Sequence, residues 1–138
     1  MVELEVWYDQ VSENDFYPGD PAILLRSASG LDALIDRVQT ETREHRVSAM
    51  VQMNIRGIEH FPVVSAGLGQ TVGFLHYLAE DAGRTIGDGD PDATVEYTYC
   101  GSLNEIPADS EVPIDVVRQG LHEFMATGTR PSVVRDFF

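Results

Sequence analysis

Every second residue is apolar in three short segments of the chain, and this period of two is typical of half-buried β-strands. The segments cover residues 2–9, 50–56 and 94–100. In the first of them Leu4 and Val6 lie on the apolar side, and the intervening positions are mostly charged. The pattern predicts three strands that each turn one face toward a hydrophobic core.

A β-hairpin is predicted over residues 62–78, and the rest of the chain is expected to be organised around it. Two apolar runs flank Gly69 and Gln70, and a glycine in the first central position permits the positive φ angle of a two-residue type II′ turn. This turn would place Leu68 opposite Thr71. Both faces of the hairpin have large apolar side chains, so we predict a central position that is covered on both sides.

Apolar residues spaced by three and four positions predict two amphipathic helices. The first is predicted to begin with Ser29 as its N-cap and to end in the polar segment 40–46. The second is predicted to begin near Pro113 and to end at Gly128, because glycine tolerates the left-handed conformation that often follows a helix. The apolar stripes comprise Leu31, Leu34, Ile35 and Val38 in the first helix and Ile114, Val117, Leu121, Phe124 and Met125 in the second.

These elements predict an α+β fold in a single domain over residues 1–138. We expect an antiparallel sheet of about five strands with a central hairpin, packed against two main helices. The strand at 50–56 would precede the hairpin in a meander. Residues 10–21 and 79–92 are rich in Gly, Pro and Asp and are predicted to be loops, and the tail 129–138 is predicted to add an edge strand.

The chain is strongly acidic, with 23 Asp and Glu residues against 9 basic residues and a formal net charge of −14. Such a surface repels nucleic acid and anionic membranes over about 8 Å at physiological salt, so a macromolecular partner is expected to be basic. The single cysteine permits no internal disulfide bond, and neither a signal peptide nor an apolar run of membrane-spanning length is apparent. We therefore expect a cytoplasmic protein that binds neither nucleic acid nor membrane.

Cys100 is the single cysteine of the sequence and a candidate nucleophile. It could act as a nucleophile with His60, His76 or His122 as its base. No catalytic motif surrounds it, however, and an alternating strand often buries a free cysteine as a small apolar residue, so we favour a structural role. The four histidines also lack the close spacing of zinc ligands.

The acidic segment around Asp90 resembles a calcium-binding loop in one respect only. Asp88, Asp90 and Asp92 occupy alternate positions, as the first ligands of such a loop do. Counting from Asp88, however, the sixth residue is Ala93 instead of glycine and the twelfth is Tyr99 instead of glutamate. The sequence therefore favours a solvated acidic turn, and we expect no metal and no cofactor.

Carboxylates concentrate in three predicted loop regions. They could serve solubility alone, or they could present negative charge to a basic cleft of a partner, and composition does not separate these alternatives. The three groups are Glu13, Asp15 and Asp20; Glu80, Asp81, Asp88, Asp90 and Asp92; and Glu105, Asp109 and Glu111.

The sequence resembles the Imm-one family of immunity proteins of bacterial polymorphic-toxin systems. The resemblance covers residues 31–37, the hairpin VSAGLGQTVGFLHYL and the segment 99–131. It departs from the family at the tail, where Val133 and Val134 follow instead of an expected tryptophan. Within 99–131 the matching positions are Gly101, Ile106-Pro107, Val112-Pro113, Glu123-Phe124, Thr127-Gly128 and Arg130-Pro131.

The resemblance implies a stoichiometric inhibitor without catalytic residues, which binds a cognate toxin domain. Toxins of this kind are often nucleic-acid deaminases, which must admit a negatively charged strand, so an acidic surface could occlude their substrate cleft. The alternatives are a small cytoplasmic hydrolase and an acidic adaptor that binds a basic protein. The predicted toxin contacts are the aromatic residues Trp7, Phe16 and Tyr17 and the acidic residues Glu80, Asp81, Asp88, Asp90, Asp92, Asp109 and Glu111.

Overall fold

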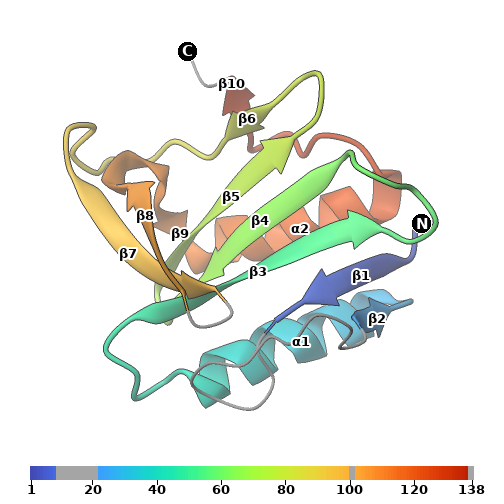
Figure 1. Cartoon of the computed structure of the whole chain (residues 1–138), viewed down its shortest axis with the longest axis horizontal. Helices are drawn as coiled ribbons and strands as arrows, with labels where there is room; N and C mark the ends of the chain where they lie inside the picture. Colours follow the sequence, from blue (N-terminus) through green and yellow to red (C-terminus); the bar gives the residue numbers. More distant parts are fainter. Residues whose placement is uncertain (9–21, 100–101, 137–138) are drawn as a thin grey trace.

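The computed structural model describes residues 1–8, 22–99 and 102–136. The predicted contacts Phe16 and Tyr17, and also Cys100, lie outside these ranges. In the described part of the chain the helices are α1 (Ala28–Glu41), η1 (Ala108–Ser110) and α2 (Ile114–Thr127), and the strands are β1 (Leu4–Trp7), β2 (Ile23–Leu25), β3 (Ser48–Ile55), β4 (Val63–Leu68), β5 (Val72–Leu78), β6 (Gly83–Arg84), β7 (Thr94–Tyr99), β8 (Ser102–Pro107), β9 (Val112–Pro113) and β10 (Arg135–Asp136) (Figure 1).

The main sheet has the strand order β10-β6-β5-β4-β3-β1-β2, and all neighbours along this path are antiparallel. The α+β class, the meander β3-β4-β5 and the tail strand β10 are confirmed. The predicted number of about five strands is wrong, because the described residues form ten. Three of the additional strands, β2, β6 and β9, have only two or three residues, which is too short for an alternating pattern to be visible in the sequence.

The hairpin β4–β5 lies at the centre of the sheet as predicted, but its register differs from the prediction. Leu68 pairs with Gly73 instead of Thr71, so four residues and not two lie between the last paired residues of the hairpin. Gly69 has no positive φ angle, and the type II′ turn is therefore wrong. The two faces of the hairpin are nevertheless as predicted, because a register shift of two residues leaves every side chain on its own face.

The longer hairpin loop is held against the end of α1. The Gln39 side chain donates to the carbonyl oxygen of Gly69 at 2.9 Å, and the Gln70 side chain donates to the carbonyl oxygen of Gln39 at 2.7 Å. A side chain at position 69 would collide with the carbonyl oxygen of Val72. Glycine is therefore required here for close backbone approach and not for a left-handed turn.

Both predicted helices are present, with one corrected boundary. The N-cap of α1 is Ser27, not Ser29: Ser27 is extended, and its hydroxyl accepts a hydrogen bond from the Gly30 N–H at 3.0 Å. Helix α2 begins directly after Pro113 and ends at Gly128, which has the predicted left-handed conformation with a φ of 69°.

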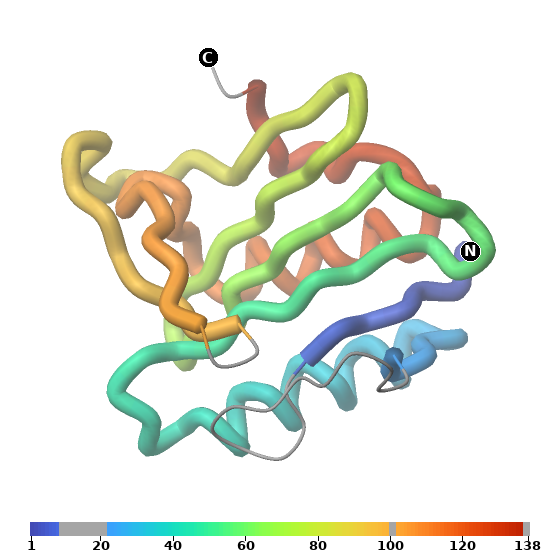
Figure 2. The backbone as a smooth tube through the Cα atoms, viewed as in Figure 1, coloured from blue at the N-terminus to red at the C-terminus, as the bar shows by residue number. Residues whose placement is uncertain are grey.

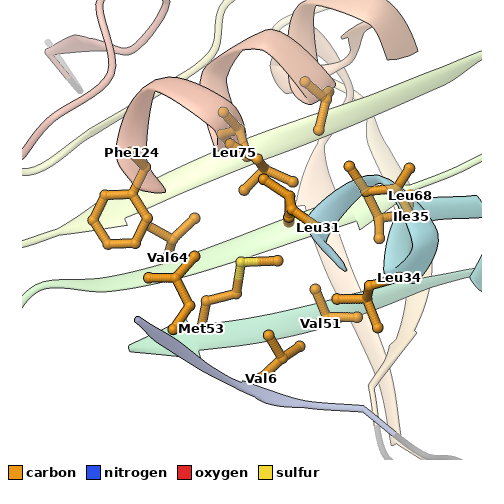
Figure 3. Close-up of a cluster of buried hydrophobic side chains, with 14 of the residues drawn as sticks. Val6, Leu31, Leu34, Ile35, Val51, Met53, Val64, Leu68, Leu75 and Phe124 are labelled. Atoms are coloured by element: carbon orange, nitrogen blue, oxygen red, sulfur yellow. The ribbon is translucent and has the colours of Figure 1, made fainter. Parts of the chain in front are cut away.

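The two helices cover one face of the sheet and enclose the main hydrophobic core (Figures 1 and 2). In Figure 3 the side chains of Val51, Met53 and Val64 from the sheet lie beside Leu31 and Phe124 from the two helices. The predicted stripes of both helices are buried, except that Ile114 is only partly buried. No helix in the described ranges is long and apolar enough to cross a membrane.

Charged side chains join the two helices at the surface of this core. Arg118 donates to Asp32 at 2.8 Å and to Asp36 at 2.9 Å, and His122 Nε2 lies 2.8 Å from the same Asp32 oxygen. The hydrogen bond with His122 and then that with Arg118 lower the pKa of Asp32. The contact of His122 with Asp32 is therefore a structural one between the two helices.

Candidate binding face

Among the described residues, the sheet face opposite the helices, called the outer face here, is covered at one end only, so the predicted cover on both sides of the hairpin is found at that end alone. Met50, Gly67 and Phe74 lie opposite one another on β3, β4 and β5, and Tyr97 from the β7–β8 hairpin packs over them. The Phe74 and Tyr97 rings meet edge to face, with centroids 4.9 Å apart. A Cβ atom at Gly67 would collide with both rings, so this glycine allows the hairpin to dock on the sheet.

The next row of the outer face leads into a buried polar network. His76 on β5 packs against the Phe74 ring, and burial followed by the nearby charge of Arg84 lowers its pKa to about 4. Arg84 donates to both carboxylate oxygens of Asp109 at 2.8 and 3.2 Å, and to the Ser110 hydroxyl at 2.8 Å. The hydrogen bond from Arg84 is the main reason why the pKa of Asp109 is lowered.

Two of the predicted toxin contacts, Asp109 and Glu111, therefore form hydrogen bonds within the molecule. The side chains of Arg84 and Asp109 are only 14% and 13% exposed to solvent. The carboxylate of Glu111 accepts a hydrogen bond from the Tyr97 hydroxyl at 2.6 Å. The structure thus gives both acids a role in holding η1 and the β7–β8 hairpin to the sheet.

The remaining predicted acidic contacts are exposed, but they lie in two separate places. Glu80 and Asp81 follow β5, whereas Asp88, Asp90 and Asp92 belong to the loop before β7 (Figure 1). The Asp92 N–H donates to Asp90 Oδ1 at 2.9 Å, which is a turn stabilised by its own side chain. Among the described residues no group of three or more His, Cys, Asp and Glu side chains could hold a metal ion.

The uncovered end of the outer face contains an open groove of about 560 Å³. Its floor includes the row formed by Glu5, Asn54 and Val63, which lie opposite one another on β1, β3 and β4. Trp7 lies diagonally across from Asn54, and its indole N–H donates to the Asn54 side-chain oxygen at 2.9 Å. The complete lining is Glu5, Trp7, Gln52, Asn54, Gly57, Ile58, Glu59, His60 and Val63.

The wall of the groove is formed by the connection between β3 and β4, called the 56–62 loop here. Gly57 has a φ of 84°, which a glycine adopts readily, and it begins the turn after β3. His60 has a φ of 72°, which is uncommon for a residue with a side chain and marks a locally strained backbone. Phe61 and Ile58 are 61% and 49% exposed, so the loop presents large apolar side chains to solvent.

This loop was not identified as functional from the sequence, although a signal was present. Ile58 and Phe61 are large apolar residues within a segment that has turn residues and no alternating pattern. Such residues have no strand or helix face through which to reach a core. Leu78, which is 39% exposed, extends the apolar surface from Val63, its partner across β4 and β5.

The hydrolase alternative requires two carboxylates and a histidine in one pocket, and Glu5, Glu59 and His60 do line the groove together. Acid–base catalysis also requires that such groups be held within hydrogen-bonding reach of one another or of a substrate. In the part of the chain that the structure describes, no hydrogen bond or ion pair joins these three side chains. The groove has the composition of a binding surface, with an aromatic ring, apolar walls and an acidic rim.

The β7–β8 hairpin has a pair of like charges that is expected to lower its stability. Glu96 and Glu105 lie directly opposite each other across the two strands, and both are exposed. Like charges in this position destabilise an antiparallel pair.

We expect the E105Q variant to raise the free energy of unfolding by about 0.5 kcal/mol in urea denaturation. E44Q, which changes an exposed glutamate outside the sheet, should leave it unchanged; an equal effect of both variants would contradict this explanation.

The described residues form an α+β fold with an open groove on one face of its sheet. The family model of the immunity protein Imm1 matches residues 19–135, which is most of the chain. The chain therefore belongs to the Imm1 immunity protein family, as its resemblance predicted. The family supports a role as an immunity protein, which acts by binding a cognate toxin and not by catalysis. No curated protein matches the chain.

Proposed function

We propose that this single-domain protein binds a cognate toxin in the cytoplasm of the producing cell and neutralises it by covering it with the outer face. The observation that supports this most strongly is the uncovered end of the sheet, where an acidic groove adjoins the exposed side chains of Ile58 and Phe61. Interfaces of this kind combine an aromatic and apolar centre with a polar rim. Family membership provides the class of partner.

We further propose that the toxin is a nucleic-acid deaminase and that the inhibitor occludes its substrate cleft. An enzyme that binds a nucleic-acid strand needs a basic groove, and the net charge of −14 is complementary to it. Glu80 and Asp81 are exposed at the same end of β5 as Leu78 and are suited to the rim of the contact. Asp88, Asp90 and Asp92 lie further away and would act mainly by accelerating association.

Co-expression tests this proposal. The toxin domain encoded by the neighbouring gene should arrest growth when produced alone, and co-production of this protein should restore growth and yield a complex in equal amounts. Purified toxin should deaminate cytosine or adenine in nucleic acid, and one equivalent of this protein should abolish the reaction. Persistent growth arrest and separate elution would contradict the immunity role; a protected toxin without deaminase activity would contradict only the toxin class.

A further inference from the structure

We propose that the groove binds an arginine side chain of the toxin, stacked on Trp7 and paired with Glu5 and Glu59. The inference rests on the proposed function for the identity of the partner and adds the chemistry of one contact. Its basis is the composition of the groove: one aromatic ring, two carboxylates and two apolar residues face the same open volume of about 560 Å³.

The indole ring of Trp7 is held in place before any partner arrives. Its N–H donates to the side-chain oxygen of Asn54, a residue of the neighbouring strand, at 2.9 Å. This contact fixes the ring against the sheet, and the ring lines the groove. Tryptophan is the aromatic side chain that attracts cations most strongly, and a fixed ring loses little freedom on binding.

The charges around the groove favour a cation. Glu5 and Glu59 both line it, and the other titratable side chain in the lining is that of His60. The guanidinium of the adjacent Arg56 forms an ion pair with Glu3 at 3.0 Å. Among the described residues it is not paired with Glu5 or Glu59. Two carboxylates disfavour a phosphate or another anion in the groove, which argues against nucleic acid as the occupant.

The apolar residues of the lining distinguish arginine from other cations. Ile58 and Val63 can contact the aliphatic part of a long side chain while its charged end meets the carboxylates. A guanidinium is planar, so it can stack on Trp7 and still direct N–H groups sideways to Glu5 and Glu59. A lysine ammonium is more strongly hydrated and cannot form this arrangement. Because the groove is open, the side chain must project from a partner's surface.

The experiment measures the dissociation constant of this protein for the toxin domain of the neighbouring gene by calorimetry. We expect the E5Q/E59Q variant to raise the constant about 10-fold and Trp7→Leu about 30-fold. The matched control E44Q/D115N removes the same number of charges from exposed carboxylates outside the groove and should leave the constant within about twofold of wild type. Far-UV circular dichroism and the urea midpoint verify the fold, and Trp7→Phe should retain part of the affinity because it keeps an aromatic face.

A double-mutant cycle identifies the occupant. Each toxin arginine is changed to glutamine in turn and tested against wild type and E5Q/E59Q. We expect one arginine whose replacement weakens binding to wild type about 10-fold but hardly affects binding to E5Q/E59Q. Independent effects for every arginine, coupling to a lysine, or an unchanged constant for E5Q/E59Q would overturn the inference while the proposed function stands. Failure of wild type to bind the toxin at all would instead refute the proposed function, and the inference with it.

Discussion

Replacement of Ile58 and Phe61 by serine is expected to weaken binding of the toxin about 100-fold without unfolding the protein. These side chains are 49% and 61% exposed in the free protein, so their removal should change the free energy of unfolding by less than about 0.5 kcal/mol. In a complex they would lie at the centre of the buried area, where aromatic and large apolar residues account for most of the binding energy. Calorimetric titration with the toxin domain gives the affinity.

A matched control is available on the same molecule. Ile86 and Leu103 are 47% and 55% exposed and lie outside the 56–62 loop and the groove. The variant with serine at both of these positions removes a comparable apolar area and should bind with nearly unchanged affinity. If this control lost as much affinity as the Ile58 and Phe61 variant, or if the latter bound like wild type, the loop would not be the centre of the interface.

Lowering the pH from 6.5 to 4 is expected to reduce the free energy of unfolding by up to about 3 kcal/mol through His76 alone. The pKa of His76 is about 4 in the folded protein and has an ordinary value of 6.5. In that interval the unfolded chain therefore binds the proton more readily than the folded one. The loss of stability through His76 is therefore small above pH 6.5, grows as the pH falls and reaches its limit below pH 4.

Urea denaturation at several pH values measures this effect, and His76→Gln provides the comparison. The variant has no group that titrates at this position, so its stability should vary less between pH 6.5 and 4. The pKa values of Asp32 and Asp109 are lowered in the folded protein, and their contribution is present above pH 3.8 and lost as the pH falls further. Equal slopes for wild type and His76→Gln between pH 6.5 and 4 would contradict the assigned role of His76.

The sequence allowed correct predictions where burial imposes a regular period. Leu31 and Val38 on α1 recur with the helical spacing because one side of the helix faces the core, and Val51 and Met53 on β3 alternate for the corresponding reason. Gly128 was predictable because few residues other than glycine tolerate its left-handed conformation. These elements depend on local geometry, which a single sequence records directly.

The predictions failed where neighbouring residues offer equal choices or where distant segments decide the structure. The N-cap at Ser27 and the predicted one at Ser29 differ only in backbone conformation, which two nearby serines do not reveal. The longer hairpin loop depends on the hydrogen bonds that Gly69 and Gln70 form with Gln39 of α1. Similarly, Asp109 was predicted as a toxin contact because the sequence does not show that Arg84 from another strand lies against it.

The groove illustrates the same limit for function. Trp7 was predicted as a contact from its residue type, and the structure places it in the groove lining beside Glu5. The opposite wall comes from the 56–62 loop, which is distant in the sequence and reaches β1 only through the pairing of β1 with β3. Glu59 and Ile58 therefore become candidates for binding only when the strand order is known.

Amide hydrogen exchange of this protein, alone and in complex with the toxin domain of the neighbouring gene, decides whether the outer face is the interface. If it is, complex formation should slow exchange most strongly in the 56–62 loop, whose N–H groups lie largely outside the strand ladders, while exchange in α1 and α2 stays unchanged. Slower exchange confined to the two helices, with none in the 56–62 loop, would place the toxin on the other side of the sheet and contradict the proposed mode of binding.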